Sequence, residues 1–199
     1  MISNYAYWYY ANAIPSGVCD EIVKIGLAGK KVKANVEGEK HKKPEDLNTK
    51  IRDSDVVWLT EDWLTNMIWT YVQRANTSAD WNFEINNVEN GQFTIYDRNQ
   101  HYDWHQDISF NKYQETFQPN SQRKLSVTIQ LTDESKYKDG DLLFSKVGDK
   151  NKKSIITDKV FRKKGTIVVF PSYMHHKVTP VTQGIRYSLV MWFRGPSFK

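Results

Sequence analysis

Apolar residues recur at helical spacing in two stretches of the first half of the chain. The first stretch covers residues 18–25, and the second covers residues 63–72, shortly after Thr60 and two acidic residues. An apolar residue at every third or fourth position is typical of an amphipathic helix, and a threonine before acidic residues is a common helix start. We therefore expect two helices within residues 15–76, with Thr60 capping the second, and both packed against another element.

From about Trp81 the period changes to two, which is typical of strands with one buried face. The alternating apolar positions are Phe83 and Ile85, then Phe93 and Ile95, then Leu125, Val127, Ile129 and Leu131, then Leu189, Met191 and Phe193. Turn-forming pairs separate these runs at Asn90-Gly91, Asp139-Gly140, Lys164-Gly165 and Gln183-Gly184. Two helices followed by many short strands predict a mainly β protein: a double-stranded β-helix, jelly-roll or cupin-like, with N-terminal supporting α-helices.

The composition narrows the class of protein without naming a function. The 199 residues fit a single domain over residues 1–199, with the helices at about 15–76 and the β-helix core at about 81–195. No apolar run is long enough to span a bilayer and no secretory signal is recognisable, so we expect a soluble protein with a cytoplasmic or otherwise intracellular location and no membrane partner. One cysteine fits a reducing compartment. The oligomeric state stays open, with a monomer favoured.

The net charge of +5 comes largely from lysine-rich loops at residues 30–43 and 146–164, where acidic residues are interspersed. A basic chain can bind nucleic acid, but mixed charges in loops are more typical of a solvated surface. A nucleic-acid partner is therefore the less favoured interpretation.

The stretch HYDWHQD at residues 101–107 contains two overlapping His-x-Asp triplets, one beginning at His101 and the other at His105. Residues two apart on a strand share a face, so the imidazole and the carboxylate of either triplet could reach one metal ion. A bare His-x-Asp is common by chance, and a metal site needs a third ligand.

Candidates for the third ligand lie in the segment GTIVVFPSYMHHKVTP, where His175 and His176 follow a buried strand. Two imidazoles and one carboxylate on one face of an ion form the facial triad of non-haem iron(II) oxygenases. Arg186 follows ten residues after His176, and its planar guanidinium can bind a carboxylate through two hydrogen bonds.

With these residues the chain resembles the Fe(II)/2-oxoglutarate-dependent dioxygenases, and within them the prolyl 4-hydroxylase branch. The family's spacing is met by Tyr96, Tyr102, His105, Asp107, His176 and Arg186, and His-Lys-Val-Thr-Pro-Val at 176–181 matches its motif. The resemblance implies that His105, Asp107 and His176 are the catalytic Fe(II) ligands, and that His176 is preferred over His175. It also implies 2-oxoglutarate as cosubstrate on Arg186 and Tyr96, O2 as oxidant, ascorbate as reductant, and a dry pocket lined by residues such as Ile129, Leu143 and Val178.

The resemblance extends to the substrate side, over about residues 50–195. It implies that a peptide contacts Arg52, Ser54, Glu89, Tyr102, Arg123 and Trp192, and that Trp58 follows the Arg-x-Ser stretch as in peptide-acting relatives. The implied reaction is 4-hydroxylation of a peptidyl proline with release of succinate and CO2. Two departures bear on this: Gly140-Asp141 stands where many relatives have Gly-Gly, and Arg186 stands where animal and algal peptidyl enzymes mostly have lysine.

Three alternatives remain open from the sequence. An oxygenase acting on a free amino acid or another small molecule would share the metal and cosubstrate residues. An oxygenase acting on alkylated nucleic acid would share them too and would bind with a strong salt dependence. A catalytically inactive binding module is less favoured because the three ligands and the arginine are all present.

Overall fold

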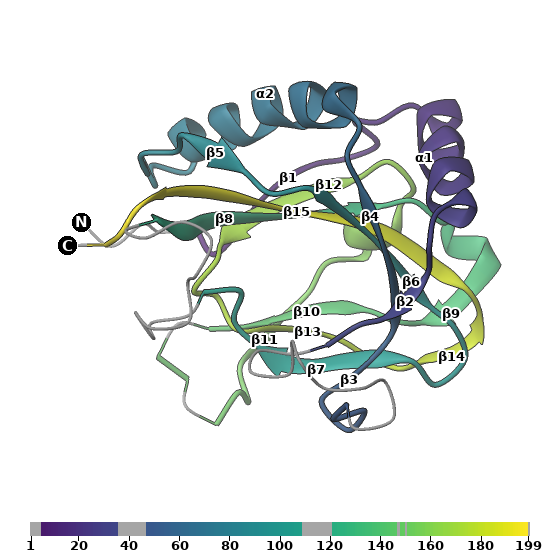
Figure 1. The fold of residues 1–199 in the computed structure, drawn as a ribbon. Helices are drawn as coiled ribbons and strands as arrows, with labels where there is room; N and C mark the ends of the chain where they lie inside the picture. The colour runs from purple at the N-terminus through teal and green to yellow at the C-terminus, as the bar shows by residue number, and fades with distance from the viewer. Residues whose placement is uncertain (1–4, 36–46, 109–120, 147, 150, 199) are drawn as a thin grey trace.

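Two antiparallel β-sheets face each other, and two helices cover the outer side of the larger sheet (Figure 1). The computed structural model describes residues 5–35, 47–108, 121–146, 148–149 and 151–198. The two facing sheets and the helices that cover one of them confirm the expected double-stranded β-helix with supporting helices. Within the described residues no helix is long and apolar enough to cross a membrane.

The larger sheet contains both N-terminal and C-terminal segments. Its strands, in spatial order, are β1 (Trp8–Tyr10), β12 (Ile167–Pro171), β8 (Ser121–Gln130), β15 (Arg186–Pro196), β6 (Gly91–Tyr96), β4 (Asp55–Leu59) and β2 (Val32–Lys33), and β5 (Asn87–Val88) pairs with the far end of β15. The long strands β8 and β15 form its centre, where Leu189 lies opposite Ile129.

The smaller sheet lies on the opposite side of the barrel-like interior (Figure 1). Its spatial order is β11 (Ile155–Ile156), β10 (Leu142–Ser145), β13 (His176–Val178), β7 (His101–His105) and β3 (Arg52–Asp53). A third, two-stranded sheet joins β14 (Val181–Gly184) to β9 (Tyr137–Asp139), and two short 3-10 helices span Glu134–Lys136 and Lys159–Arg162.

The two predicted helices are present as α1 (Ser16–Ala28) and α2 (Asp62–Ser78). Their buried faces, including Ile22 and Ile68, join one apolar cluster with the larger sheet. The expected Thr60 cap is wrong, because the position before α2 is Glu61 and no side chain caps the helix there.

The two faces of β8 separate the core from the site. Leu125, Val127, Ile129 and Leu131 belong to the cluster under the helices. The alternate residues Ser126, Thr128 and Gln130 are also buried, and strand alternation directs them toward the other sheet. Ile129 therefore packs under the helices and does not line the pocket, so that expectation is wrong.

The interior between the sheets holds a second apolar cluster, which includes Val178 at the end of β13. Its buried members are Tyr96, Leu142, Phe144, Phe161, Val168, Phe170, Met174, Val178 and Val181. Val178 thus lies in the interior, as expected.

The first part of the alternating region, which was expected to form a strand, does not form one. Residues 81–86 contain no strand, although Phe83 and Ile85 still pack against the large cluster. Apolar alternation there reflects an extended segment packed on the core, without a partner strand. The expected turn at Asp139-Gly140 is present, with φ of 59° and 66° at its two residues.

Candidate functional site

The smaller sheet brings two histidines together. His105 ends β7, His176 begins β13, and the two residues lie opposite each other in register. Asp107 follows β7, and its backbone N–H donates to the carbonyl of Ser172 at 2.9 Å. One ligand atom from each of His105, Asp107 and His176 lies within 4.8 Å of the other two.

Backbone hydrogen bonds fix the orientation of both imidazoles. His105 Nδ1 lies 2.8 Å from the carbonyl oxygen of Asp103, and His176 Nδ1 lies 3.0 Å from that of Met174. A carbonyl can only accept, so each Nδ1 carries the proton and each Nε2 presents its lone pair. The Nε2 atoms lie 3.8 Å and 3.5 Å from the two oxygens of Asp107.

The charges at this cluster suit a divalent cation. Burial disfavours the charged form of Asp107, but His176, His105 and Arg123 outweigh it and lower its pKa to about 2. Burial lowers the pKa of His105 well below its ordinary value, so its imidazole is neutral. Among the described residues, Asp107 Oδ2 is buried without a hydrogen-bond partner. Two imidazoles and one ionised carboxylate with such an oxygen fit a metal ion.

The two competing histidines lie outside this cluster. The imidazole of His101 contacts the carbonyl oxygens of Asn99 and Lys50, each at 3.2 Å. His175 precedes the strand and its side chain is only partly buried. Neither joins the group whose ligand atoms converge.

A buried arginine lies at the start of β15. Arg186 is 3% exposed, pairs in register with Tyr96, and has its guanidinium 5.5 Å from the Tyr96 ring. Its Nη1 is 3.5 Å from the hydroxyl of Ser188. Within the described part of the chain, no carboxylate forms an ion pair with Arg186. Burying an unpaired cation is costly, so this position favours an anionic ligand.

Leu143, which was expected to line the cosubstrate pocket, lies on the wrong face of β10. It pairs with Lys177, whereas its neighbours Leu142 and Phe144 pair with Val178 and His176 and belong to the interior cluster. Because side chains alternate across a strand, Leu142 and Phe144 provide the apolar wall.

Tyr102 covers one side of the histidine cluster. The register between β7 and β13 shifts, so that His105 faces His176 while Tyr102 faces Val178. This bulge turns Tyr102 and His105 to one side, with their rings stacked at 3.4 Å. Arg52 lies 4.5 Å above Tyr102 and donates from Nε to Ser54 Oγ at 3.1 Å, which brings three expected substrate residues together.

The other expected substrate residues form an ion-paired group beside Asp107. Arg123 donates to both oxygens of Glu89, at 2.7 Å and 2.6 Å, and to the carbonyl of Asp107 at 3.3 Å. Arg194 donates to Glu89 Oε1 at 2.8 Å. Hydrogen bonds from these arginines lower the pKa of Glu89, against burial, which would raise it. Glu89 is thus engaged within the protein.

Trp192 joins this group to the protein surface. The Arg123 guanidinium lies 3.9 Å from its ring, and Trp58, which is 48% exposed, lies 6.2 Å away on the other side. The indole N–H of Trp192 is buried and has no hydrogen-bond partner among the residues that the structure describes. Arg194 was missed by the sequence reasoning, although its position two residues after Trp192 on the same strand was an available signal.

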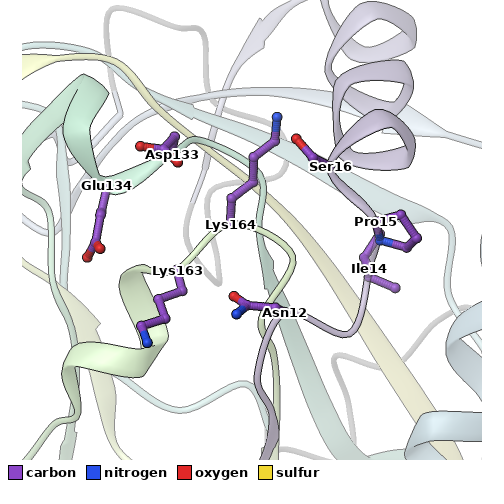
Figure 2. Close-up of a pocket in the computed structure, with 8 residues that line it drawn as sticks. All are labelled: Asn12, Ile14, Pro15, Ser16, Asp133, Glu134, Lys163 and Lys164. Atoms are coloured by element: carbon purple, nitrogen blue, oxygen red, sulfur yellow. The ribbon is translucent and has the colours of Figure 1, made fainter.

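A separate pocket of about 370 Å³ lies at the start of α1 and shares no residue with the histidine cluster. Figure 2 shows its lining of both charges: Asn12, Ile14, Pro15, Ser16, Asp133, Glu134, Lys163 and Lys164. Lys164 is paired with Asp20 at 2.5 Å. This mixed lining favours no particular ligand charge.

His105, Asp107 and His176 converge as a group that could hold a metal ion, with a buried arginine also present, on a double-stranded β-helix. Residues 91–194, just over half of the chain, match the 2OG-Fe(II) oxygenase superfamily. The protein therefore belongs to this superfamily, whose members use Fe(II), 2-oxoglutarate and O2.

Two hydroxylases are similar in sequence over part of the chain. A PKHD-type hydroxylase of Synechococcus sp. (strain CC9605) is 36% identical over 91 residues, covering 46% of this chain and 35% of that protein. One of Alteromonas mediterranea is 30% identical over 103 residues, covering 51% of this chain and 42% of that protein. The matched region thus spans well under half the length of these relatives.

Solved prolyl hydroxylases share the fold along nearly the whole chain. The viral collagen prolyl hydroxylase of Paramecium Bursaria Chlorella virus-1, in its 2OG complex, has a TM-score of 0.66 at 18% identity and covers 96% of this chain and 97% of its own. A Pseudomonas putida prolyl-4-hydroxylase has a TM-score of 0.64 at 17% identity, covering 98% and 95%. A Trichoplax adhaerens prolyl hydroxylase bound to a hypoxia inducible factor peptide has a TM-score of 0.64 at 15% identity, covering 96% and 84%.

Proposed function

We propose that this protein hydroxylates a peptidyl proline at the expense of 2-oxoglutarate, releasing succinate and CO2. The observation that carries the proposal is the wall of the site: Tyr102 stacks on His105, and the ring of Trp192 lies against the Arg123 guanidinium. A proline ring suits aromatic faces, and the peptide backbone of an extended proline segment leaves carbonyls that need donors. Prolyl hydroxylases among the structures of the same fold support this substrate class.

In this proposal His105, Asp107 and His176 hold Fe(II). The iron, with 2-oxoglutarate and O2, supplies the oxidising power for an unactivated C–H bond. The protein's part is to hold the ligands: the carbonyls of Asp103 and Met174 keep both Nε2 lone pairs directed at one point.

The distal carboxylate of 2-oxoglutarate meets Arg186 in the buried end of the pocket, with Tyr96 alongside. The guanidinium provides two parallel donors for a carboxylate, and its burial strengthens that pair. Leu142 and Phe144 provide the dry wall that excludes water.

The substrate segment lies along Tyr102, Trp192 and the exposed Trp58. The Arg52 guanidinium above Tyr102 provides a donor for a peptide carbonyl. Glu89 acts through Arg123, since both of its oxygens are engaged by that side chain. Recognition through aromatic faces and backbone carbonyls makes binding depend little on the charge of the peptide.

Mass spectrometry of proline-rich peptides incubated with the protein, Fe(II), ascorbate and 2-oxoglutarate tests the proposal. We expect the gain of one oxygen atom on proline. Trp58→Ala should raise the KM for peptide and leave the KM for 2-oxoglutarate unchanged. Trp63→Ala, an equally bulky and 40% exposed residue on α2, is the matched control and should change neither.

Two other outcomes would replace the proposed substrate. Oxidation of free proline or lysine with no turnover of any proline peptide would favour a small-molecule oxygenase. Oxidation of a methylated oligonucleotide, weakened steeply by salt, would favour a nucleic-acid oxygenase. In either case the metal and cosubstrate residues keep their proposed roles.

A further inference from the structure

The turn between β9 and β10 encloses the side chain of Arg186. Gly140, at the tip of this turn, has φ +66°, and a Cβ there would lie 3.2 Å from Arg186 Cδ and 3.6 Å from Tyr137 Cε2. The stem of Arg186 and the ring of Tyr137 therefore meet over the glycine. Tyr137 is 4% exposed; burial raises the pKa of its hydroxyl, and the nearby guanidinium groups of Arg186 and Arg162 oppose that rise.

The backbone just before Arg186 is paired with the backbone of Tyr137. Gly184 pairs in register with Tyr137, with φ +73°. A Cβ at Gly184 would lie 2.1 Å from the carbonyl oxygen of Lys136 and 3.0 Å from Tyr137 Cα, so only glycine permits this approach. Arg186 follows two residues later, so Tyr137 fixes both the entry of β15 and the guanidinium.

A second arginine, Arg162, lies over the ring of Tyr137. The Arg162 guanidinium lies 4.4 Å from the Tyr137 ring and donates to the Tyr137 carbonyl at 3.3 Å. Its Nη1 also donates to the carbonyl of Asp139 at 2.7 Å and to Asp141 Oδ1 at 2.5 Å. The Asp141 carboxylate therefore anchors Arg162 beside the turn.

We propose that Tyr137 is a positioning residue for the anion clamp, held in place by Arg162 and Asp141. This inference rests on the proposed role of Arg186 in binding 2-oxoglutarate. The arginine side chain has several rotatable bonds. The Tyr137 hydroxyl on one side and the turn packed against the aliphatic part of Arg186 limit its guanidinium to one orientation. The clamp then binds the carboxylate without first losing that freedom.

Calorimetric titration of the Mn(II)-loaded protein with 2-oxoglutarate, without O2, tests the inference. Tyr137→Phe keeps the ring and removes only the hydroxyl, and we expect it to weaken binding about five- to tenfold, as for loss of a polar contact with a charged group. Asp141→Asn, which weakens the anchor of Arg162 without altering the core, should weaken binding about two- to fourfold. Mn(II) affinity should stay unchanged in both variants.

Tyr187→Phe is the matched control. Tyr187 is adjacent to Arg186 but faces the helix side, where it stacks on Phe93 with ring centroids 5.4 Å apart. It should bind 2-oxoglutarate as the unchanged protein does.

Arg186→Ala separates failure of this inference from failure of the clamp itself. Weak binding by Arg186→Ala together with normal binding by Tyr137→Phe and Asp141→Asn would overturn the positioning role and leave the clamp. Normal binding by Arg186→Ala would overturn the clamp and the inference with it. If Tyr137→Phe failed to fold, Asp141→Asn alone would decide, and its normal binding would overturn the proposal.

Discussion

Two buried arginines lie on neighbouring central strands, Arg186 on β15 and Arg123 on β8, and they differ in their partners. Arg123 is bound by both oxygens of Glu89, which Arg194 also contacts. Arg186 is more deeply buried, and its contacts among the described residues are with neutral groups of Tyr96, Tyr137 and Ser188.

The difference indicates what each arginine is for. An ionised group removed from water is destabilising unless a counter-charge and hydrogen bonds compensate it. Arg123 has its counter-charge within the protein and can hold a wall of the site in shape. Arg186 lacks one, so a ligand carboxylate is the natural partner, and the protein gains affinity for an anion at that position.

The contrast also divides the residues expected to contact substrate. Glu89 has both oxygens engaged by protein donors, so it shapes the wall through Arg123. Trp58, which is exposed, is the group of this wall that remains open to a substrate. Contact with a peptide thus falls on the aromatic residues.

The largest expected effect comes from the group formed by His105, Asp107 and His176. Asp107→Ala removes the carboxylate whose unpaired oxygen fits a metal ion, so Mn(II) binding and substrate-free decarboxylation of 2-oxoglutarate should both be abolished. Mn(II) binding is measured by electron paramagnetic resonance, and succinate formation reports turnover.

His175→Ala is the control for this change, since His175 lies next to His176 but outside the converging group. It should retain most of the activity. A dead His175→Ala with an active His176→Ala would place the third ligand one residue earlier.

The second prediction tests the unpaired arginine directly. Arg186→Ala should weaken 2-oxoglutarate binding roughly a hundredfold, the effect of losing a charge-assisted, two-point contact in a buried site. Arg186→Lys keeps the charge without the fork, so its affinity should be intermediate. Titration calorimetry on the Mn(II)-loaded protein measures both. Arg123→Lys, which changes the paired arginine in the same way, should leave 2-oxoglutarate affinity within about threefold.

The sequence was sufficient for the fold class and for the residues of the metal cluster, for physical reasons. Alternation with a period of two survives in every long strand, so Leu189 and Phe193 identify the buried face of β15. The spacing of His105, Asp107 and His176 singled out three residues whose ligand atoms converge in the structure.

What the sequence could not give depends on strand register and on contacts between distant segments. Leu143 was placed in the pocket, although a shift of one residue turns a side chain to the other face. The bulge that turns Tyr102 toward His105 has no local signature. The partnership of Arg162 with Tyr137 joins residues 25 apart through a 3-10 helix, and no periodicity predicts it.

The third prediction concerns the paired arginine and the stability of the fold. Arg123→Met removes both hydrogen bonds that Arg123 donates to Glu89, whose side chain is 24% exposed, so the free energy of unfolding should fall by roughly 2 kcal/mol. Urea denaturation measures it. Lys24→Met breaks an ion pair whose side chains are 77% and 51% exposed and should leave the unfolding midpoint unchanged. A loss no greater than that of the control would show that the pair is not a structural element.

The smallest expected effect is the pH dependence of the same pair. Burial alone would raise the pKa of Glu89, but Arg123 and Arg194 outweigh it, so the pKa lies below its ordinary value of 4.5. A depressed carboxyl pKa adds stability that is fully present above the unfolded value and is lost as the pH falls through the folded value. The difference in unfolding free energy between the unchanged protein and Glu89→Gln should therefore be about 1 kcal/mol at neutral pH and vanish in the acid range below 4.5. In an Arg123→Met background the pH-dependent part of this free-energy difference should shrink, because Arg123 contributes most to lowering the pKa of Glu89. A difference that grew as the pH fell would mean that burial raises the pKa of Glu89 more than the arginines lower it. Arg123 would then not be compensated by Glu89, and the contrast with Arg186 would be wrong.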